Sequence, residues 1–243
     1  MNLQEKTVII TGGVRGIGQA TALKFANKGI NIVIADVDNE ANETVKKIKE
    51  LGGKAIYIKT DVSNKKEVQL LVEKTLKRFN GIDILINNAG VSQFNIDFED
   101  IKEEEWDWMM NINLKGVFFC CQAVFPHMKS KCSGKIVNVA SISAKTGGVK
   151  SGAHYASAKA GVVSLTKSIA KKGAPYGINV NAVSPGVIET DMTKNVAYEI
   201  SSIPLGRLGK AEEVAEVIYF LASDAARYIT GEIVDVDGGM SMD

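Results

Sequence analysis

Histidine and cysteine are scarce in this chain, and their scarcity excludes several kinds of site. The two histidines, His127 and His154, cannot form a metal site that needs several histidine ligands. The three cysteines, Cys120, Cys121 and Cys132, lack the spacing of metal ligands and are too few for a disulfide framework. We therefore expect no metal, and reduced thiols in a cytoplasmic protein.

An excess of one charge and a long apolar run are missing as well. The chain has 29 Lys and Arg against 28 Asp and Glu, which argues against a general nucleic-acid or membrane-surface binder. No apolar stretch approaches the roughly 20 residues that span a bilayer. The first residues, Met1–Lys6, do not show the basic and then apolar layout of a secretory signal. We expect a cytoplasmic protein with no nucleic-acid or membrane partner.

What the chain does contain is a regular alternation of short apolar runs and longer segments with helical periodicity. The expected strands are Thr7–Ile10, Asn31–Ala35, Ala55–Lys59, Ile84–Asn87, Lys135–Val139, Asn179–Val183 and Glu232–Val236. The expected helices are Gly18–Lys28, Glu40–Leu51, Lys65–Phe79, Glu103–Lys131, Tyr155–Lys172 and Ala211–Leu221. Such alternation predicts an α/β fold, a doubly wound parallel sheet of about seven strands with helices on both faces.

No linker or repeat interrupts this pattern, so we expect one Rossmann-type domain over residues 1–243. Only the stretch Val187–Leu208 breaks the rhythm, after a strand that ends in Ser184-Pro185-Gly186. Ligands of doubly wound sheets bind beyond the carboxyl ends of the strands. This stretch is therefore predicted to be a substrate lid.

Three glycines, Gly12, Gly16 and Gly18, fall where the first strand turns into the first helix. Glycine there permits a tight turn and a close approach to a pyrophosphate, and the helix N-terminus offers free N–H groups. A glycine-rich turn without a ligand is the simpler interpretation. The strand before and the helix after favour a dinucleotide site instead.

Two charged residues bear on which dinucleotide would bind. Asp36 ends the second strand, where a carboxylate accepts hydrogen bonds from ribose hydroxyls and repels a 2′-phosphate, which favours NAD. Arg15 could pair with that phosphate, which keeps NADP possible. We expect Asp36 to dominate.

Small polar clusters follow the next two strands, at the same end of the sheet. Asp61-Val62 follows the third strand and Asn87-Asn88-Ala89-Gly90 the fourth. Each alone is typical of a turn. In register with the glycine loop, they are expected to line one cleft.

A tyrosine and a lysine four residues apart, Tyr155 and Lys159, share one face of a predicted helix. The pKa of tyrosine is ordinarily about 10, and a nearby ammonium lowers it toward the range useful for proton transfer. A serine at the end of the neighbouring strand, Ser141, could hold the substrate oxygen. These residues predict proton transfer at a carbonyl or alcohol. Ser143 lies close enough in sequence to be the alternative serine, and His154 is a candidate for substrate contact.

The chain resembles the short-chain dehydrogenase/reductase family over essentially its whole length. The matching motifs are Thr11-Gly-x-x-x-Gly-x-Gly18, Asp61-Val62, Asn87-Asn-Ala-Gly90, Asn113-Leu-Lys-Gly116, a strand-end serine, Tyr155-x-x-x-Lys159 and Pro185-Gly186. The resemblance implies a catalytic set of Asn113, Ser141, Tyr155 and Lys159. The cofactor contacts it implies are Gly12, Arg15, Gly16, Ile17, Gly18, Asp36, Asp61, Val62, Asn88, Ala89, Gly90, Tyr155, Lys159, Pro185, Gly186, Ile188 and Thr190.

Within this family the chain is most similar to 3-oxoacyl-(acyl carrier protein) reductases, on Asn179–Thr193, Pro204–Gly209 and Tyr228–Gly239. The resemblance implies an acyl-thioester or other carbonyl substrate and a homotetramer. Asp36 and the short lid keep a second hypothesis open, an NAD-dependent polyol, sugar or other secondary-alcohol dehydrogenase. A third hypothesis is a non-catalytic dinucleotide-binding regulator, against which the complete Ser, Tyr, Lys and Asn set argues.

Overall fold

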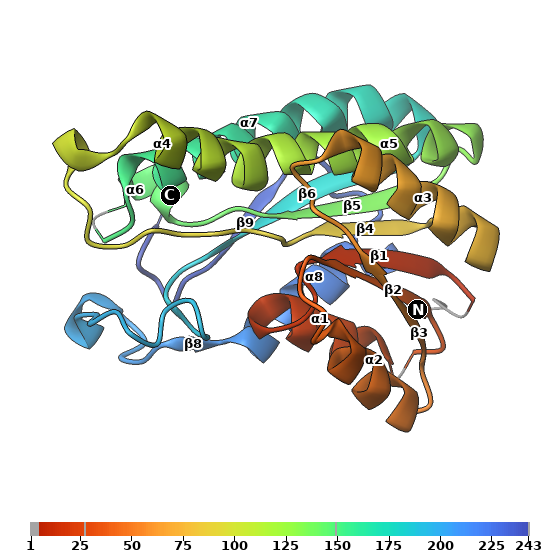
Figure 1. Ribbon diagram of the computed structural model, residues 1–243, viewed down its shortest axis with the longest axis horizontal. Helices are drawn as coiled ribbons and strands as arrows, with labels where there is room; N and C mark the ends of the chain where they lie inside the picture. Colours follow the sequence, from red (N-terminus) through yellow and green to blue (C-terminus); the bar gives the residue numbers. More distant parts are fainter. Residues whose placement is uncertain (1–4, 27, 149, 243) are drawn as a thin grey trace.

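A single parallel sheet of seven strands organises the chain (Figure 1). The computed structural model describes residues 5–26, 28–148 and 150–242. The strand order is β3-β2-β1-β4-β5-β6-β9. The strands are β1 (Thr7–Thr11), β2 (Asn31–Asp36), β3 (Lys54–Lys59), β4 (Ile84–Asn87), β5 (Gly134–Val139), β6 (Ile178–Pro185) and β9 (Ile233–Val236). The predicted α/β sheet is confirmed.

Helices cover both faces of this sheet. One face carries α1 (Gly16–Ala26), α2 (Ala41–Glu50) and α8 (Ala211–Leu221). The other face carries α3 (Lys65–Phe79), α5 (Gly116–Ser130) and α7 (Ala153–Gly173), with α4 (Glu103–Met110) beyond them (Figure 1). Among the described residues, no helix has the length and apolar character that crossing a membrane requires.

Side chains of the central strand explain why the layers form. Val8 and Ile10 pack into the core on the α1 and α8 side, whereas Ile9 packs into the core on the α3 and α5 side. All three are fully buried. A strand with no polar face needs helices on both sides, because apolar surface left in water is unfavourable.

The direction of the strand order changes at β1. This strand pairs with β2 on one side and with β4 on the other, from Val8↔Ile84 to Ile10↔Ile86. After these strands the chain therefore continues on opposite faces of the sheet, to α1 after β1 and to α4 and α5 after β4. This divergence creates the crevice in which doubly wound sheets bind ligands.

Most helices and strands begin and end within a few residues of the expected bounds. The division of one helix and the presence of another were not expected. The helix expected over Glu103–Lys131 is divided by a π-helical turn, Asn111–Lys115, into α4 and α5. A short helix α6 (Ser143–Thr146) follows β5 and had no counterpart among the expected elements. The helix expected over Gly18–Lys28 begins two residues earlier, at Gly16, and residue 27 lies outside the described residues.

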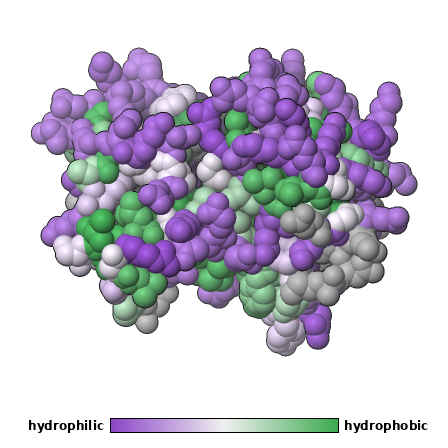
Figure 2. All heavy atoms as spheres, turned by 90° about the horizontal axis from the view of Figure 1, so that it is seen from below, coloured by the Kyte–Doolittle hydropathy of each residue, from purple (hydrophilic) through white to green (hydrophobic). Residues whose placement is uncertain are grey.

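The segment predicted as a lid folds without a long helix. It contains the two-residue strand β7 (Ile188–Glu189) and the turn Ile200–Ser202, and β7 pairs with β8 (Gly209–Lys210). Its large apolar side chains Met192, Ile200 and Leu205 are exposed. Figure 2 views the molecule from below. It shows apolar side chains at the lower left, on the side where the segment lies in Figure 1.

Candidate active site

A cavity of about 1050 Å³ opens at the carboxyl ends of the central strands. Its wall brings together the glycine loop, the ends of β2 to β6, helix α7 and the lid segment. Every site residue expected from the sequence lines this cavity except Gly18 and His154. Expected site residues as far apart as Gly12 and Thr190, 178 positions, thus share one cavity.

The glycine loop adopts the backbone that its sequence predicts. Gly12 and Gly16 have positive φ angles of 66° and 54°, which other residues rarely adopt. Helix α1 begins at Gly16, so the unpaired N–H groups of its first turn lie at the cavity wall. This arrangement fits a pyrophosphate.

Gly18 lies behind the loop rather than in the cavity wall. A Cβ atom at Gly18 would lie 2.1 Å from the carbonyl oxygen of Gly12 and 2.5 Å from the amide nitrogen of Asn88. Gly18 is not among the residues that line the cavity, and its contact with a cofactor stays a prediction. Its missing side chain lets helix α1 approach the strand, which places the loop.

Asn88 ties the loop after β4 to the glycine loop. Its side-chain Nδ2 donates to the carbonyl oxygens of Thr11 (3.1 Å) and Gly12 (2.8 Å). In return, the Thr11 hydroxyl accepts from the backbone N–H groups of Asn88 (3.0 Å) and Ala89 (3.1 Å). The two loops are held as one unit.

The carboxylate of Asp36 is held at the end of β2 by backbone donors. It accepts from the N–H of Val14 (3.3 Å) and from the N–H of Asp38 (3.1 Å). Arg15 forms an ion pair with Asp38, a cavity residue that sequence reasoning missed. The guanidinium that could have bound a phosphate is thus already paired with a carboxylate.

At the third strand, the two expected residues have different surroundings. Asp61 accepts from the N–H (2.8 Å) and the hydroxyl (2.7 Å) of Ser63, which closes a turn. Val62 is buried and contacts Gly116, where a Cβ atom would lie 2.8 Å from the valine methyl. Both still line the cavity.

The reactive groups lie at the opposite end, on α7 and after β5. The Ser141 hydroxyl is hydrogen-bonded with the Tyr155 phenol. The Lys159 ammonium donates to the carbonyl oxygen of Val139 (2.7 Å) and lies 5.7 Å from the centre of the Tyr155 ring. Lys159 is 4% exposed, an unusual position for a charged side chain.

The pKa of Tyr155 differs from the expectation that Lys159 would lower it. Burial raises the pKa of Tyr155 to about 12, against the lowering effect of its hydrogen bond with Ser141. Burial also lowers the pKa of Lys159 to about 8. For the protein without a cofactor, the expected lowering of the Tyr155 pKa was wrong. The Lys159 ammonium donates to the carbonyl oxygen of Val139, and burial disfavours the charged phenolate.

Asn113 lies within the π-helical turn and is fully buried. Its side chain accepts from the N–H of Val91 (3.2 Å) and donates to the carbonyl oxygen of Val91 (3.0 Å). A Cβ atom at Gly90 would lie 2.8 Å from Asn113 Oδ1 and 3.7 Å from Lys159 Nζ. A side chain at position 90 would therefore clash with the Asn113 amide and reach the Lys159 ammonium, so glycine is required there.

The two serine candidates have different neighbours. Ser141 contacts Tyr155, whereas the Ser143 hydroxyl lies 3.2 Å from the Ser151 hydroxyl. Both line the cavity, and the geometry favours Ser141 as the partner of the phenol.

His154 does not occupy the position expected of a substrate contact. It is fully buried, its Nε2 lies 3.0 Å from Gln93 Oε1, and it is not among the cavity residues. Successive residues of a helix point in different directions, so Tyr155 faces the cavity and His154 faces the core.

The remaining expected contacts follow β6. The N–H of Gly186 donates to the carbonyl oxygen of Val236 (3.0 Å), and a Cβ atom at Gly186 would lie 2.7 Å from the Asp237 backbone. Pro185, Ile188 and Thr190 complete this wall. They lie on the same cavity as Tyr155, as expected for the nicotinamide end of a dinucleotide.

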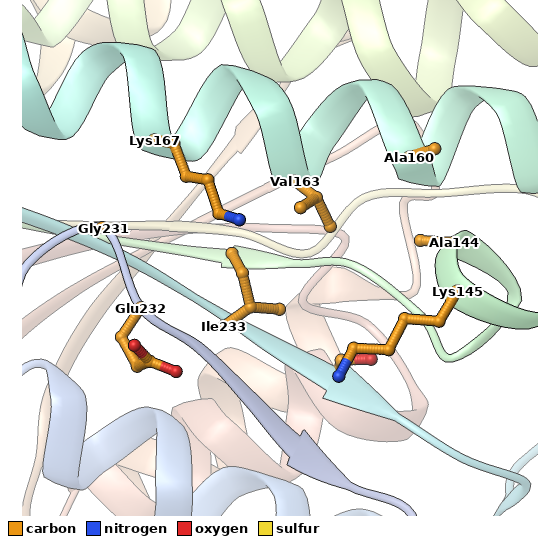
Figure 3. A pocket seen from close by; sticks show the side chains of 9 residues that line it. Ala144, Lys145, Ala160, Val163, Lys167, Gly231, Glu232 and Ile233 are labelled. Atoms are coloured by element: carbon orange, nitrogen blue, oxygen red, sulfur yellow. The ribbon is translucent and has the colours of Figure 1, made fainter. Parts of the chain in front are cut away.

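A second cavity, of about 220 Å³, lies between α7 and β9 and shares no lining residue with the first. Lys145, Lys167 and Ile233 line it (Figure 3). Lys145 donates to the carboxylate of Asp235 (2.7 Å). None of the residues predicted for the site lies there.

Comparisons with known proteins agree with this geometry. The profile of a family described as enoyl-(acyl carrier protein) reductase matches residues 12–241. The chain is 42% identical to the 3-oxoacyl-[acyl-carrier-protein] reductase FabG of Thermotoga maritima, over 99% of each chain. It is 44% identical to a 3-oxoacyl-[acyl-carrier-protein] reductase of Synechocystis sp., over 99% of this chain and 98% of the relative.

Solved structures are similar over the whole chain as well. The crystal structure of gox2181 superposes with a TM-score of 0.95 at 36% identity, over 98% of this chain and 96% of the other. That of levodione reductase superposes with a TM-score of 0.93 at 35% identity, over 98% of each.

Proposed function

Because the chain belongs to the short-chain dehydrogenase/reductase family, we propose that it reduces the ketone of a 3-oxoacyl thioester, with NADH as the preferred cofactor. Membership makes it an oxidoreductase that uses a nicotinamide cofactor and acts on a carbonyl or alcohol. The contact of Ser141 with Tyr155, in the cavity that also holds the glycine loop, is the observation that carries the proposal.

In the proposed mechanism, Tyr155 donates its proton to the ketone oxygen and Ser141 hydrogen-bonds the same oxygen. A bound nicotinamide cofactor supplies the hydride and, once oxidised, a positive charge. Burial lowers the pKa of Lys159 to about 8, so its ammonium keeps its proton at neutral pH. A hydrogen bond to the carbonyl oxygen of Val139 fixes the position of this ammonium. Asn113 lies beside Gly90, and its hydrogen bond to the carbonyl oxygen of Val91 fixes the loop after β4. This loop forms part of the cavity wall near Lys159.

The substrate class is inferred from the relatives' names, and the cavity supports it. Apolar side chains such as Phe94, Trp108 and Met192 line the cavity, which suits an acyl chain. We propose the segment 187–208 as the lid, because Met192, Tyr198 and Ser202 face the cavity from it. An acyl carrier protein would then deliver the substrate, and a cytoplasmic location stays a prediction.

A second candidate is an NAD-dependent dehydrogenase of another secondary alcohol. Asp36 accepts from the N–H of Asp38, and the Asp38 carboxylate pairs with Arg15; two carboxylates at the expected ribose end support NAD. The similarity to levodione reductase supports a ketone other than a 3-oxoacyl thioester. Turnover by the purified protein separates the candidates. Acetoacetyl, crotonyl and simple ketone substrates would be compared with NADH and with NADPH. Oxidation of NADH by acetoacetyl thioester alone supports the proposal, and activity only on simple ketones or polyols supports the second candidate.

Asp36 should determine the choice of cofactor. Asp36→Ala removes two ribose acceptors and a charge that repels phosphate, so we expect NADH to bind about tenfold more weakly and NADPH to bind better. Asp38→Ala is the contrasting variant: it releases Arg15 and should improve NADPH binding without weakening NADH. Fluorescence titration of both nucleotides measures these affinities. A wild-type preference for NADPH would contradict the assignment.

We also propose a homotetramer. The apolar residues Met109, Val117, Cys121 and Val162 of the long helices do not face a partner, because they are buried in the core. Apolar surface remains on α4 and α5, where Trp106 and Phe118 are 39% and 41% exposed. Symmetric pairing of these helices would cover it. Light scattering at micromolar concentration should give about four times the 26.1 kDa chain mass, and a monomer mass would refute the proposal.

A further inference from the structure

Tyr198 occupies an unusual position in the lid segment. Its neighbours Ala197 and Glu199 are exposed, yet Tyr198 itself is half-buried and lines the cavity together with Ser141 and Tyr155. A large side chain that is covered while its neighbours face solvent is held by the cavity wall. Tyr198 thus belongs to the reacting end of the site, although no motif in the sequence marks it.

The Tyr198 hydroxyl is a donor without a protein partner among the described residues. Among other polar groups of the cavity wall, Ser143 is paired with Ser151, Asn113 with Val91, and Ser202 with the carbonyl oxygen of Glu199, whereas the buried Ser92 hydroxyl has no partner among the described residues. Burial raises the pKa of Tyr198, so its phenol stays protonated at neutral pH. A ligand in the cavity would therefore meet a hydroxyl that is ready to donate.

Tyr198 also lies close to Tyr155. Both phenols line the same cavity, where an ionised Tyr198 would add to the raised pKa of Tyr155. Two phenols facing one cavity offer two donors to one substrate. Tyr155 and Ser141 bind the oxygen of the ketone that is reduced. The Tyr198 phenol can therefore bind another oxygen of the same substrate.

A 3-oxoacyl thioester has such an oxygen, because its thioester carbonyl lies two carbons from the ketone. We propose that the Tyr198 hydroxyl donates a hydrogen bond to this second carbonyl and thereby selects 1,3-dicarbonyl substrates. The inference rests on the proposed function, and it assigns Tyr198 to specificity rather than to proton transfer.

The test compares two substrates that differ in this carbonyl alone. One is the acetoacetyl thioester of N-acetylcysteamine, and the other is the thioether in which CH₂ replaces the thioester carbonyl. The wild-type protein should have a kcat/KM about five- to tenfold higher for the thioester, in line with one hydrogen bond. Tyr198→Phe should remove this difference by lowering kcat/KM for the thioester alone, with unchanged NADH affinity. Tyr228→Phe, at a fully exposed tyrosine outside the cavity, is the matched control.

Three outcomes would overturn the proposal: equal wild-type kcat/KM for the two substrates, an unchanged preference in Tyr198→Phe, or an equal loss on both. Failure of the proposed function gives a different result. In that case wild-type protein does not reduce the thioester, whether or not it reduces the thioether and whichever residue stands at position 198.

Discussion

Tyr155→Phe should lower kcat by about 10³-fold, which is the size of effect expected when the only general acid is removed. The phenol is the one group in the described cavity that combines a transferable proton with a hydrogen bond to Ser141. The Lys159 ammonium is committed to the carbonyl oxygen of Val139 and does not replace it. Steady-state rates of NADH oxidation measure the loss.

The same variant should bind NADH as the wild type does, because phenylalanine keeps the ring that lines the cavity. Tyr176→Phe is a suitable control, since Tyr176 lies outside the cavity wall. A variant that keeps more than a tenth of wild-type kcat would show that another group protonates the substrate. Weaker NADH binding would show instead that the hydroxyl helps to hold the cofactor.

Gly18→Ala should destabilise the fold and abolish cofactor binding together. The new methyl group would lie 2.1 Å from the carbonyl oxygen of Gly12, and backbone atoms cannot swing aside as a side chain does. Overpacking of this kind costs about 3 kcal/mol. For a chain of this size, that corresponds to a fall in melting temperature of about 6–12 °C.

Gly81→Ala is the matched control, because the nearest atom to its new methyl group is the flexible end of Lys131, at 3.3 Å. Thermal denaturation with and without NADH separates the two effects. We expect Gly81→Ala to keep both its melting temperature and its stabilisation by NADH. Wild-type stability in Gly18→Ala would mean that helix α1 can move away from the strand at little cost.

Much of the fold could be predicted because its elements repeat simple patterns. Apolar runs such as Val8-Ile9-Ile10 mark a strand buried on both faces, and helical periodicity placed Lys65–Phe79 and Ala211–Leu221 with the bounds observed. The glycine loop could be located because positive φ angles at Gly12 and Gly16 restrict these positions to few residue types.

The features that could not be predicted depend on contacts between distant segments. The π-helical turn at Asn111–Lys115 depends on Asn113 reaching the backbone of Val91. Asp38 enters the site only through its pairing with Arg15, and Tyr198 only because the lid turns its ring inward. The raised pKa of Tyr155 reflects burial, which spacing in a sequence does not show.

The change of strand direction at β1 has a consequence for how the chain reaches its native state. β1 pairs with β4, whose first partner residue, Ile84, lies 76 positions after Val8. During synthesis, one edge of this buried strand cannot be covered until Asn87 has emerged. Pairings over such distances slow folding and leave apolar edges exposed to aggregation. We therefore expect fragments that end before residue 87 to aggregate, and a translational pause there to favour soluble protein.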